Sequence, residues 1–276
     1  MSALRIQLFG TVTVSHDGRP QDVRPIHAVQ SLLAWLLLNR RRTHAREALA
    51  ALFWSEQTES RARSCLSTAL WRLRQVLEPA GIPRGTYLIG QSDTVAFNCA
   101  SDYWLDVAAF EDGVGRGAEE AIACYTGDLL EGFYDEWIIR ERERLRMLYL
   151  DALGVRLRRH SDADELDRAV HCGRKILALD PLREDIHRAL IRLHLRNGHR
   201  SLALQQYDAC RALLRRELGV EPMEETRALC ADLAGASPAI VRPLPITPKL
   251  RMAAAKLDEA RDAIADALRA AESPQK

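Results

Sequence analysis

The sequence predicts a mostly α-helical protein with a small amount of β-structure near its N-terminus. After residue 104, apolar residues recur at the three- and four-residue spacing of amphipathic helices. Before residue 100, short stretches of alternating apolar and polar residues lie on both sides of three helical segments. With 276 residues, the chain is long enough for two domains, each with its own core.

The first hundred residues contain strands, three helices and a hairpin, in that order. Alternation over residues 4–8 and 11–14, followed by an Asp17-Gly18 turn, predicts short antiparallel strands. Helices are predicted at 28–39, at 45–53 with Thr43 as the cap, and at 60–78. The segments TYLIG and TVAFN on either side of Gln91-Ser92-Asp93 predict a β-hairpin. This order is that of a winged helix-turn-helix, in which the third helix enters the major groove and the hairpin wing lies along the adjacent DNA.

The third helix, SRARSCLSTALWRLRQVLE, has a polar side suited to a DNA groove. Ser60 is its expected N-cap, and the apolar stripe is Ala62, Leu66, Ala69, Leu70, Leu73, Val76 and Leu77. The rest of its surface carries arginines, hydroxyls and an amide, the groups that reach base edges and phosphates. Alone, the stretch fits either a groove-binding helix or a solvated helix of mixed charge. The winged-helix order favours the groove.

Charge and cysteine usage agree with an intracellular DNA-binding protein. Residues 1–100 hold twelve arginines against seven acidic residues, a net charge of +5, whereas the remainder has a net charge of −4. The six cysteines are scattered without a CxxC pair, as in a reducing cytoplasm. There is no secretory signal, and the longest apolar run, 32–38, is too short to span a membrane. We therefore expect a cytoplasmic protein without membrane association.

The second half of the chain predicts an all-α, tetratricopeptide-like domain over residues 101–236. Ala169 and Ala203 occupy equivalent positions 34 residues apart, which is the tetratricopeptide period. Gly219 and Pro222 are expected to end the last long helix. The predicted helices are 104–112, 117–126, 136–158, 164–178, 184–196, 200–217 and 223–233, with GVGRG (113–117) as a loop. Such an array has a concave surface for a peptide, a second copy or the DNA-binding domain.

The last forty residues divide into a proline-rich linker, 237–249, and a C-terminal helix, 250–276. In the helix, Leu250, Leu257 and Ile264 recur every seven residues with alanines between them. This pattern fits a weak coiled coil or, our preferred interpretation, a helix that docks on the second domain.

No catalytic or cofactor motif is visible. The sequence lacks HExxH, G-x-S-x-G, GxxxxGK[ST] and a Rossmann fingerprint. His187 and His194 lie seven residues apart without a cysteine or carboxylate to complete a metal site. We therefore expect no enzyme activity, no metal and no cofactor.

Specific stretches resemble a known family. LRIQLFGTVTVSHDGRP, SLLAWLLLNRRRTHAREALAALFW and ARSCLSTALWRLRQVL resemble the winged helix of the streptomycete antibiotic regulatory proteins (SARPs). YTGDLLEGFYDEWIIRERERLRMLYLDAL and the residues through LGVEP resemble the bacterial transcriptional activator domain that follows it in that family. Together the two resemblances cover about residues 4–235.

The resemblance implies a sequence-specific transcriptional activator of promoter direct repeats, with head-to-tail subunits and RNA polymerase holoenzyme as a partner. It implies a base or groove contact for Arg72, a phosphate contact for Arg74, and a loop, 55–59, that faces polymerase through Glu56, Gln57 and Glu59. The wing tip lacks a basic residue, and Arg84 is its expected substitute. The full set of expected DNA-binding residues is Arg61, Arg63, Ser64, Ser67, Thr68, Trp71, Arg72, Arg74 and Arg84.

Three alternatives remain open. The Arg40-Arg41-Arg42 run is either a phosphate contact or a cationic end that complements the dipole of the first helix. Glu59 either binds a partner or complements the dipole of the third helix. The whole chain could instead be an interaction scaffold, in which the helical array binds a protein or small ligand and the winged helix is a docking module.

Overall fold

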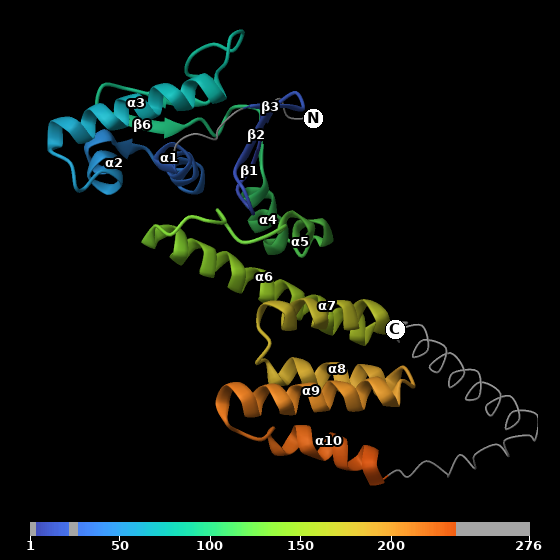
Figure 1. Cartoon of the computed structure of the whole chain (residues 1–276). Coiled ribbons are helices and arrows are strands. Elements are labelled where there is room, and N and C mark those ends of the chain that lie inside the picture. The colour runs from blue at the N-terminus through green and yellow to red at the C-terminus, as the bar shows by residue number, and fades with distance from the viewer. Residues whose placement is uncertain (1–3, 22–26, 236–276) are drawn as a thin grey trace, which may run out of the picture. The chain divides into compact units, whose positions relative to one another are not determined.

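The N-terminal sheet of the computed structural model is completed by a strand from beyond residue 100 (Figure 1). Its strands are β1 (Leu4–Gln7), β2 (Thr13–His16), β3 (Arg19–Gln21) and β7 (Tyr103–Leu105), in the order β3-β2-β1-β7. β7 pairs in parallel with β1, whereas the other pairs are antiparallel. The helix predicted from residue 104 is therefore wrong at its start. Trp104 lies in β7, with the Arg5 guanidinium carbon 3.8 Å from the centroid of its ring.

The structure describes residues 4–21 and 27–235, and the chain divides into two compact units, 1–186 and 187–276. The expected linker at 237–249 and the expected helix at 250–276 lie outside the described residues. The expected domain boundary at residue 100 falls inside the first unit, and it stays a proposal.

The winged helix follows the first three strands. Its elements are α1 (His27–Leu38), β4 (His44–Ala45), α2 (Arg46–Phe53), α3 (Glu59–Leu77), β5 (Leu88–Gly90) and β6 (Thr94–Phe97). The three short strands form a second sheet in the order β4-β6-β5. The core is fully buried and consists mainly of leucines, because each helix turns its apolar stripe inward; it includes Leu32, Leu33, Leu36, Leu37, Leu66, Leu70 and Leu73. The predicted strand, helix and hairpin order is thus present.

Two predicted helix caps are wrong. α3 begins at Glu59 with Thr58 in the N-cap position, so Ser60 lies inside the first turn. α2 begins after Ala45, not after Thr43, because residues 44–45 pair with β6 as strand β4. α3 thus begins earlier than the serine signal predicts. α2 begins later than the threonine signal predicts, because strand pairing takes up the residues between.

Buried polar and aromatic contacts connect the winged helix to the helices that follow it. The Asp106 carboxylate, at the start of α4 (Asp106–Gly115), accepts hydrogen bonds from the backbone N–H groups of Leu8 and Phe9 at 2.8 and 2.9 Å. Trp35 of α1 packs edge-on against Trp137 of α6 (Glu136–Asp162), with ring centroids 5.1 Å apart. Strand, winged helix and α6 therefore share one packed body within the first unit.

The remaining helices of the first unit are α5 (Glu119–Cys124) and α7 (Leu166–Leu179). The loop predicted at 113–117 is wrong in part, because α4 continues to Gly115. Gly113 faces α5 so closely that a Cβ there would lie 2.4 Å from the Cβ of Ala121. The loop before α6 is held by Arg142, whose guanidinium donates to the carbonyls of Leu129, Leu130 and Phe133 at 2.7–2.9 Å.

The second unit begins within α8 (Glu184–Arg196) and contains α9 (Arg200–Leu218) and α10 (Glu224–Gly235). Ile191 and Ala203 form its buried centre. α9 is capped by Gly219 with φ +70°, the left-handed conformation that the sequence predicts there. Ala169 in the first unit and Ala203 in the second are both fully buried, as their 34-residue spacing predicts. The predicted fold class, mostly α with a small β part, is confirmed.

Candidate nucleic-acid interface

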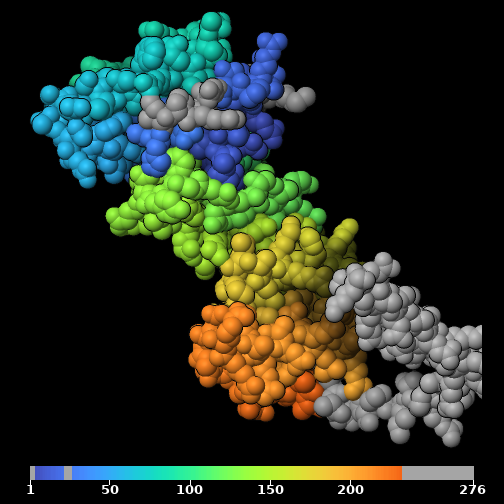
Figure 2. Space-filling view, viewed as in Figure 1, coloured from blue at the N-terminus to red at the C-terminus, as the bar shows by residue number. Residues whose placement is uncertain are grey.

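α3 divides into a buried side and an exposed side along its whole length. Six apolar residues of the predicted stripe are buried, and Val76 is partly buried. On the opposite side Arg61, Ser64, Thr68 and Trp71 are exposed, and the Trp71 side chain exposes 56% of its surface. A large aromatic residue so exposed on a helix packed by its other side is available to an external partner. Figure 2 shows α2 and the first half of α3, in cyan, at the surface of the first unit.

Arg72 borders a shallow groove between α1 and α3. The groove has a volume of about 240 Å³, and Ser64, Thr68 and Trp54 line it together with Arg72. Arg72 is half-buried, so its aliphatic stem packs against the protein. The structure thus brings Arg72 together with two of the predicted hydroxyl residues.

Arg74 connects the third helix to the wing. Its guanidinium lies over Gly90 of β5, so closely that a Cβ at Gly90 would lie 2.6 Å from Arg74 Nη2. The end of the Arg74 side chain thus reaches from the helix to the hairpin. The sequence alone gives no sign of this contact, because the two residues lie in separate elements.

Arg63 is occupied by carboxylates of the chain itself. It forms ion pairs with Glu47 of α2, at 2.9 Å, and with Glu59 one turn earlier in α3. Glu59 is therefore engaged within the helix, and its position in the first turn also complements the helix dipole. Glu56 and Gln57 are exposed in the loop before the helix.

The hydroxyl groups of α3 bond within the helix. Ser67 donates to the carbonyl of Arg63 at 2.9 Å, and Thr68 donates to the carbonyl of Ser64 at 3.0 Å. Ser67 also accepts a 3.0 Å hydrogen bond from Arg46 of α2. Arg46, which sequence reasoning missed, thus stands beside the predicted residues. Its only sequence signal is a basic residue at the start of the second helix.

The wing is fixed by backbone contacts at both of its ends. The Glu78 carboxylate, just after α3, accepts from the N–H groups of Gly85, Tyr87 and Leu88 at 2.9–3.1 Å. At the tip, the N–H of Arg46 donates to the carbonyl of Asp93 at 2.8 Å. Arg84 is exposed in the loop that Glu78 holds.

For the Arg40-Arg41-Arg42 run after α1, the structure supports one of the two interpretations at its first residue. Arg40 Nη1 donates to the carbonyl of Leu37 at 3.2 Å, within the last turn of the helix. This contact supports the helix-end interpretation for Arg40. Arg41 and Arg42 are exposed.

The described part of the chain has neither a cluster of metal ligands nor a helix that could span a membrane. Among residues 4–21 and 27–235, no three His, Cys, Asp or Glu side chains are grouped so that they could hold a metal ion. Over the same residues, every helix is too short or too polar to cross a membrane.

Comparison with known proteins finds a family match for the helical part of the chain and relatives for most of its length. Residues 106–233 match the model of the bacterial transcriptional activator domain. The chain is 30% identical over 260 residues to the regulatory protein AfsR of Streptomyces coelicolor, covering 86% of the chain and 25% of AfsR. It is 28% identical over 225 residues to the transcriptional regulatory protein MoaR1 of Mycobacterium tuberculosis, covering 72% of the chain and 70% of MoaR1.

A solved structure shares the fold. Mycobacterium tuberculosis EmbR, in complex with a low-affinity phosphopeptide, matches with a TM-score of 0.64 at 20% identity. The match covers 95% of this chain and 72% of the EmbR chain. The named relatives are regulators, which confirms that the chain is not an enzyme. The activator-domain match at residues 106–233 and the likeness to AfsR and MoaR1 support a SARP-type transcriptional regulator.

Proposed function

We propose that the chain is a cytoplasmic, sequence-specific DNA-binding activator that binds direct repeats in promoters and recruits RNA polymerase holoenzyme. The observation that carries the proposal is the exposed side of α3, where Arg61, Ser64, Thr68 and Trp71 face outward. The other side of the helix is fixed in the core by buried leucines. A helix held in this way fits a major groove about 12 Å wide, with arginine and hydroxyl groups toward the bases.

Arg72 and Arg74 are proposed to have different roles. Arg72 lies beside Ser64 and Thr68, so we assign it to base reading. Arg74 lies at the junction of helix and wing, against Gly90, so we assign it to the phosphate backbone. Arg61, Arg63, Ser67 and Arg84 complete the proposed surface. For Arg63 this requires exchange of its carboxylate partners for phosphate.

The first experiment selects the site and measures its salt dependence. The full chain is incubated with randomised duplexes, bound duplexes are sequenced, and affinity for the enriched site is followed by fluorescence anisotropy. With about 4–6 phosphate contacts per subunit, log affinity should fall with log salt at a slope of about −4 to −5. A slope near zero without sequence enrichment would instead support the scaffold alternative, in which the helical array binds a protein or small ligand.

The second experiment tests the head-to-tail dimer. Subunits that bind direct repeats should occupy half-sites one helical turn, about 10 base pairs, apart. We expect two subunits to bind cooperatively to two enriched repeats at this spacing. Five additional base pairs between the repeats should remove the cooperativity, because the second subunit would then face the opposite side of the duplex. Equal cooperativity at both spacings would contradict contact between subunits on DNA.

Recruitment of polymerase is proposed for the loop at 55–59. Glu56 and Gln57 are exposed there, whereas Glu59 is engaged by Arg63. Carboxylates close to a DNA-binding surface disfavour phosphate, so a protein partner with basic groups suits them better. The two exposed residues are therefore the ones to test.

A further inference from the structure

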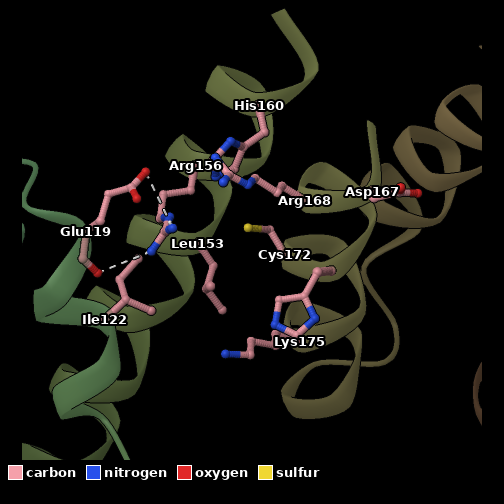
Figure 3. Close-up of a pocket in the computed structure, with 10 residues that line it drawn as sticks. Glu119, Ile122, Leu153, Arg156, His160, Asp167, Arg168, Cys172 and Lys175 are labelled. Atoms are coloured by element: carbon pink, nitrogen blue, oxygen red, sulfur yellow. Dashed lines mark hydrogen bonds and ion pairs between the residues drawn. The ribbon is translucent and has the colours of Figure 1, made fainter. Parts of the chain in front are cut away.

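A pocket in the activator domain combines an apolar floor with several cationic side chains. It lies between α5, α6 and α7, all within the first unit, and has a volume of about 470 Å³ (Figure 3). This volume is within the range of roughly 300–1,000 Å³ found for small-molecule sites. Ile122, Leu153 and Cys172 are buried in its floor. The pocket is separate from the proposed DNA-binding surface and has no role in it.

Cationic groups reach this pocket from two facing helices. Arg156 extends from α6, and Arg168 and Lys175 extend from α7 (Figure 3). His160 and His171 also line it, against two carboxylates, Glu119 and Asp167. The lining therefore favours a negatively charged occupant, provided that some of these cations are not already neutralised.

Ion pairs within the protein neutralise the charges of the two arginines but not the charge of the lysine. Arg156 binds Glu119 through its carboxylate at 3.5 Å and through its backbone carbonyl at 3.2 Å. Arg168 is paired with Glu165. Lys175 has no ion-pair partner among the described residues, and it is the single lysine in residues 1–248. The ammonium group of Lys175 is thus the cation that an incoming anion can engage without displacing a carboxylate.

The positive charges are close to the apolar floor. Burial raises the pKa of the Cys172 thiol, and the nearby charges of Arg156 and Lys175 oppose that rise. Arg156 is also held in place by Glu119 before any ligand binds, which lowers the entropic cost of ordering it around a ligand. Floor and cations therefore present an apolar surface and a positive rim to the same occupant.

We propose that this pocket binds a small organic anion, in which a carboxylate or phosphate group is joined to an apolar body. The apolar body would lie over Ile122, Leu153 and Cys172, and the anionic group would lie beside Lys175 and Arg156. The pocket is open to such a molecule and too small for a macromolecule. Binding there requires neither DNA nor polymerase, so the proposal stands or falls independently of the proposed function.

The first test uses 8-anilinonaphthalene-1-sulfonate, an aromatic anion that fluoresces when it enters an apolar site. It is titrated into the full chain, with the uncharged N-phenyl-1-naphthylamine as the matched probe. Lys175→Met should weaken binding of the sulfonate about tenfold, the factor that one charge-assisted hydrogen bond contributes. Lys175→Arg should retain binding within about twofold. The control, Arg174→Met, removes an exposed cation from the same helix that does not line the pocket, and should also stay within about twofold.

The outcomes separate a pocket for anions from general dye binding. Equal affinity for the charged and uncharged probes, or equal loss in Lys175→Met and Arg174→Met, overturns the proposal. Thermal melting of each variant excludes unfolding as the cause, which is a minor concern because Lys175 is exposed. Competition by octanoate but not octyl phosphate identifies a carboxylate site, and the reverse identifies a phosphate site. Failure of both to compete contradicts an anion site.

A second test locates the bound anion by chemical labelling of the lysine nearest to it. Pyridoxal 5′-phosphate carries an aldehyde that condenses with a lysine amine, losing water, and borohydride then reduces the imine to a stable amine. We expect labelling at Lys175 to exceed labelling at Lys249, Lys256 and Lys276, the other lysines of the chain. Pyridoxal, which lacks the phosphate, should show no such preference. Equal labelling of all four lysines by both reagents contradicts a site at Lys175.

Discussion

The carboxylate of Asp106 accepts a 2.8 Å hydrogen bond from the backbone N–H of Leu8, 98 residues earlier in the chain. The same oxygen accepts from Phe9, and the side chain is buried. Asp106→Ala leaves both N–H groups unpaired, and each costs about 1–3 kcal/mol, so we expect the free energy of unfolding to fall by about 3 kcal/mol. Urea denaturation measures it. The control Asp112→Ala, exposed on the same helix, should change stability by less than about 0.5 kcal/mol.

Asp106 should also give stability a specific pH dependence. Burial raises the pKa of Asp106 above its usual value, although hydrogen bonds from Phe9, Leu8 and Val107 oppose the rise. Between the usual pKa of aspartate and the raised value, the folded state binds more protons than the unfolded state. The Asp106 contribution to the free energy of unfolding therefore decreases as pH rises through this window. Asp106→Asn, which cannot titrate, should remove this decrease when unfolding is measured from acid to neutral pH. An identical pH profile in wild type and variant contradicts the assignment.

Substitutions of Arg74 and Arg72 should separate phosphate contact from base reading. Arg74→Ala should weaken binding to selected and scrambled duplexes by the same factor, because a phosphate carries no base identity. Arg72→Ala should cost roughly 1–3 kcal/mol on the selected duplex and relax preference at one base position. Fluorescence anisotropy on both duplexes gives the comparison. If neither variant changes affinity for either duplex, α3 does not enter the groove.

The ion pairs of Arg63 should restrain DNA binding. Glu47 and Glu59 both hold its guanidinium, and both carboxylates repel phosphate. The double variant Glu47→Gln, Glu59→Gln frees Arg63 for a phosphate contact. We expect tighter binding at low salt and a salt slope steeper by about one unit. Glu120→Gln, at an exposed position of α5, is the control and should leave the slope unchanged. Weaker binding by the double variant would show instead that these ion pairs hold α3 in the orientation that binds DNA.

The loop before α3 should act in activation and not in binding. Glu56→Ala with Gln57→Ala leaves the ion pair of Glu59 with Arg63 intact, so the start of the helix is preserved. The double variant should bind its promoter with normal affinity yet lose transcription in a purified polymerase system. Full transcription by this variant would eliminate the loop as the activating surface, and the helical domain would become the next candidate.

Local patterns in the sequence predict the helices and the hairpin well, because their signals are periodicity and turn residues within each element. Contacts between distant segments have no such signal. β7 spans three residues and pairs with a strand about a hundred residues earlier, so residues 103–105 resemble the start of a helix. Arg46, Glu78 and Arg142 were missed for the same reason, since each acts on a backbone or side chain in another element. The exposed side of α3, by contrast, follows directly from its own spacing.

The parallel pairing of β1 with β7 determines when, during synthesis, the N-terminal sheet can be completed. During synthesis β1 leaves the ribosome about a hundred residues before Leu105, the last residue of the strand that covers one of its edges. Until then that edge exposes unpaired N–H and C=O groups, which invite pairing with another nascent chain. A fragment cut at residue 100 keeps this open edge permanently. A DNA-binding fragment for expression should therefore extend through β7 and the Asp106 carboxylate that holds Leu8 and Phe9.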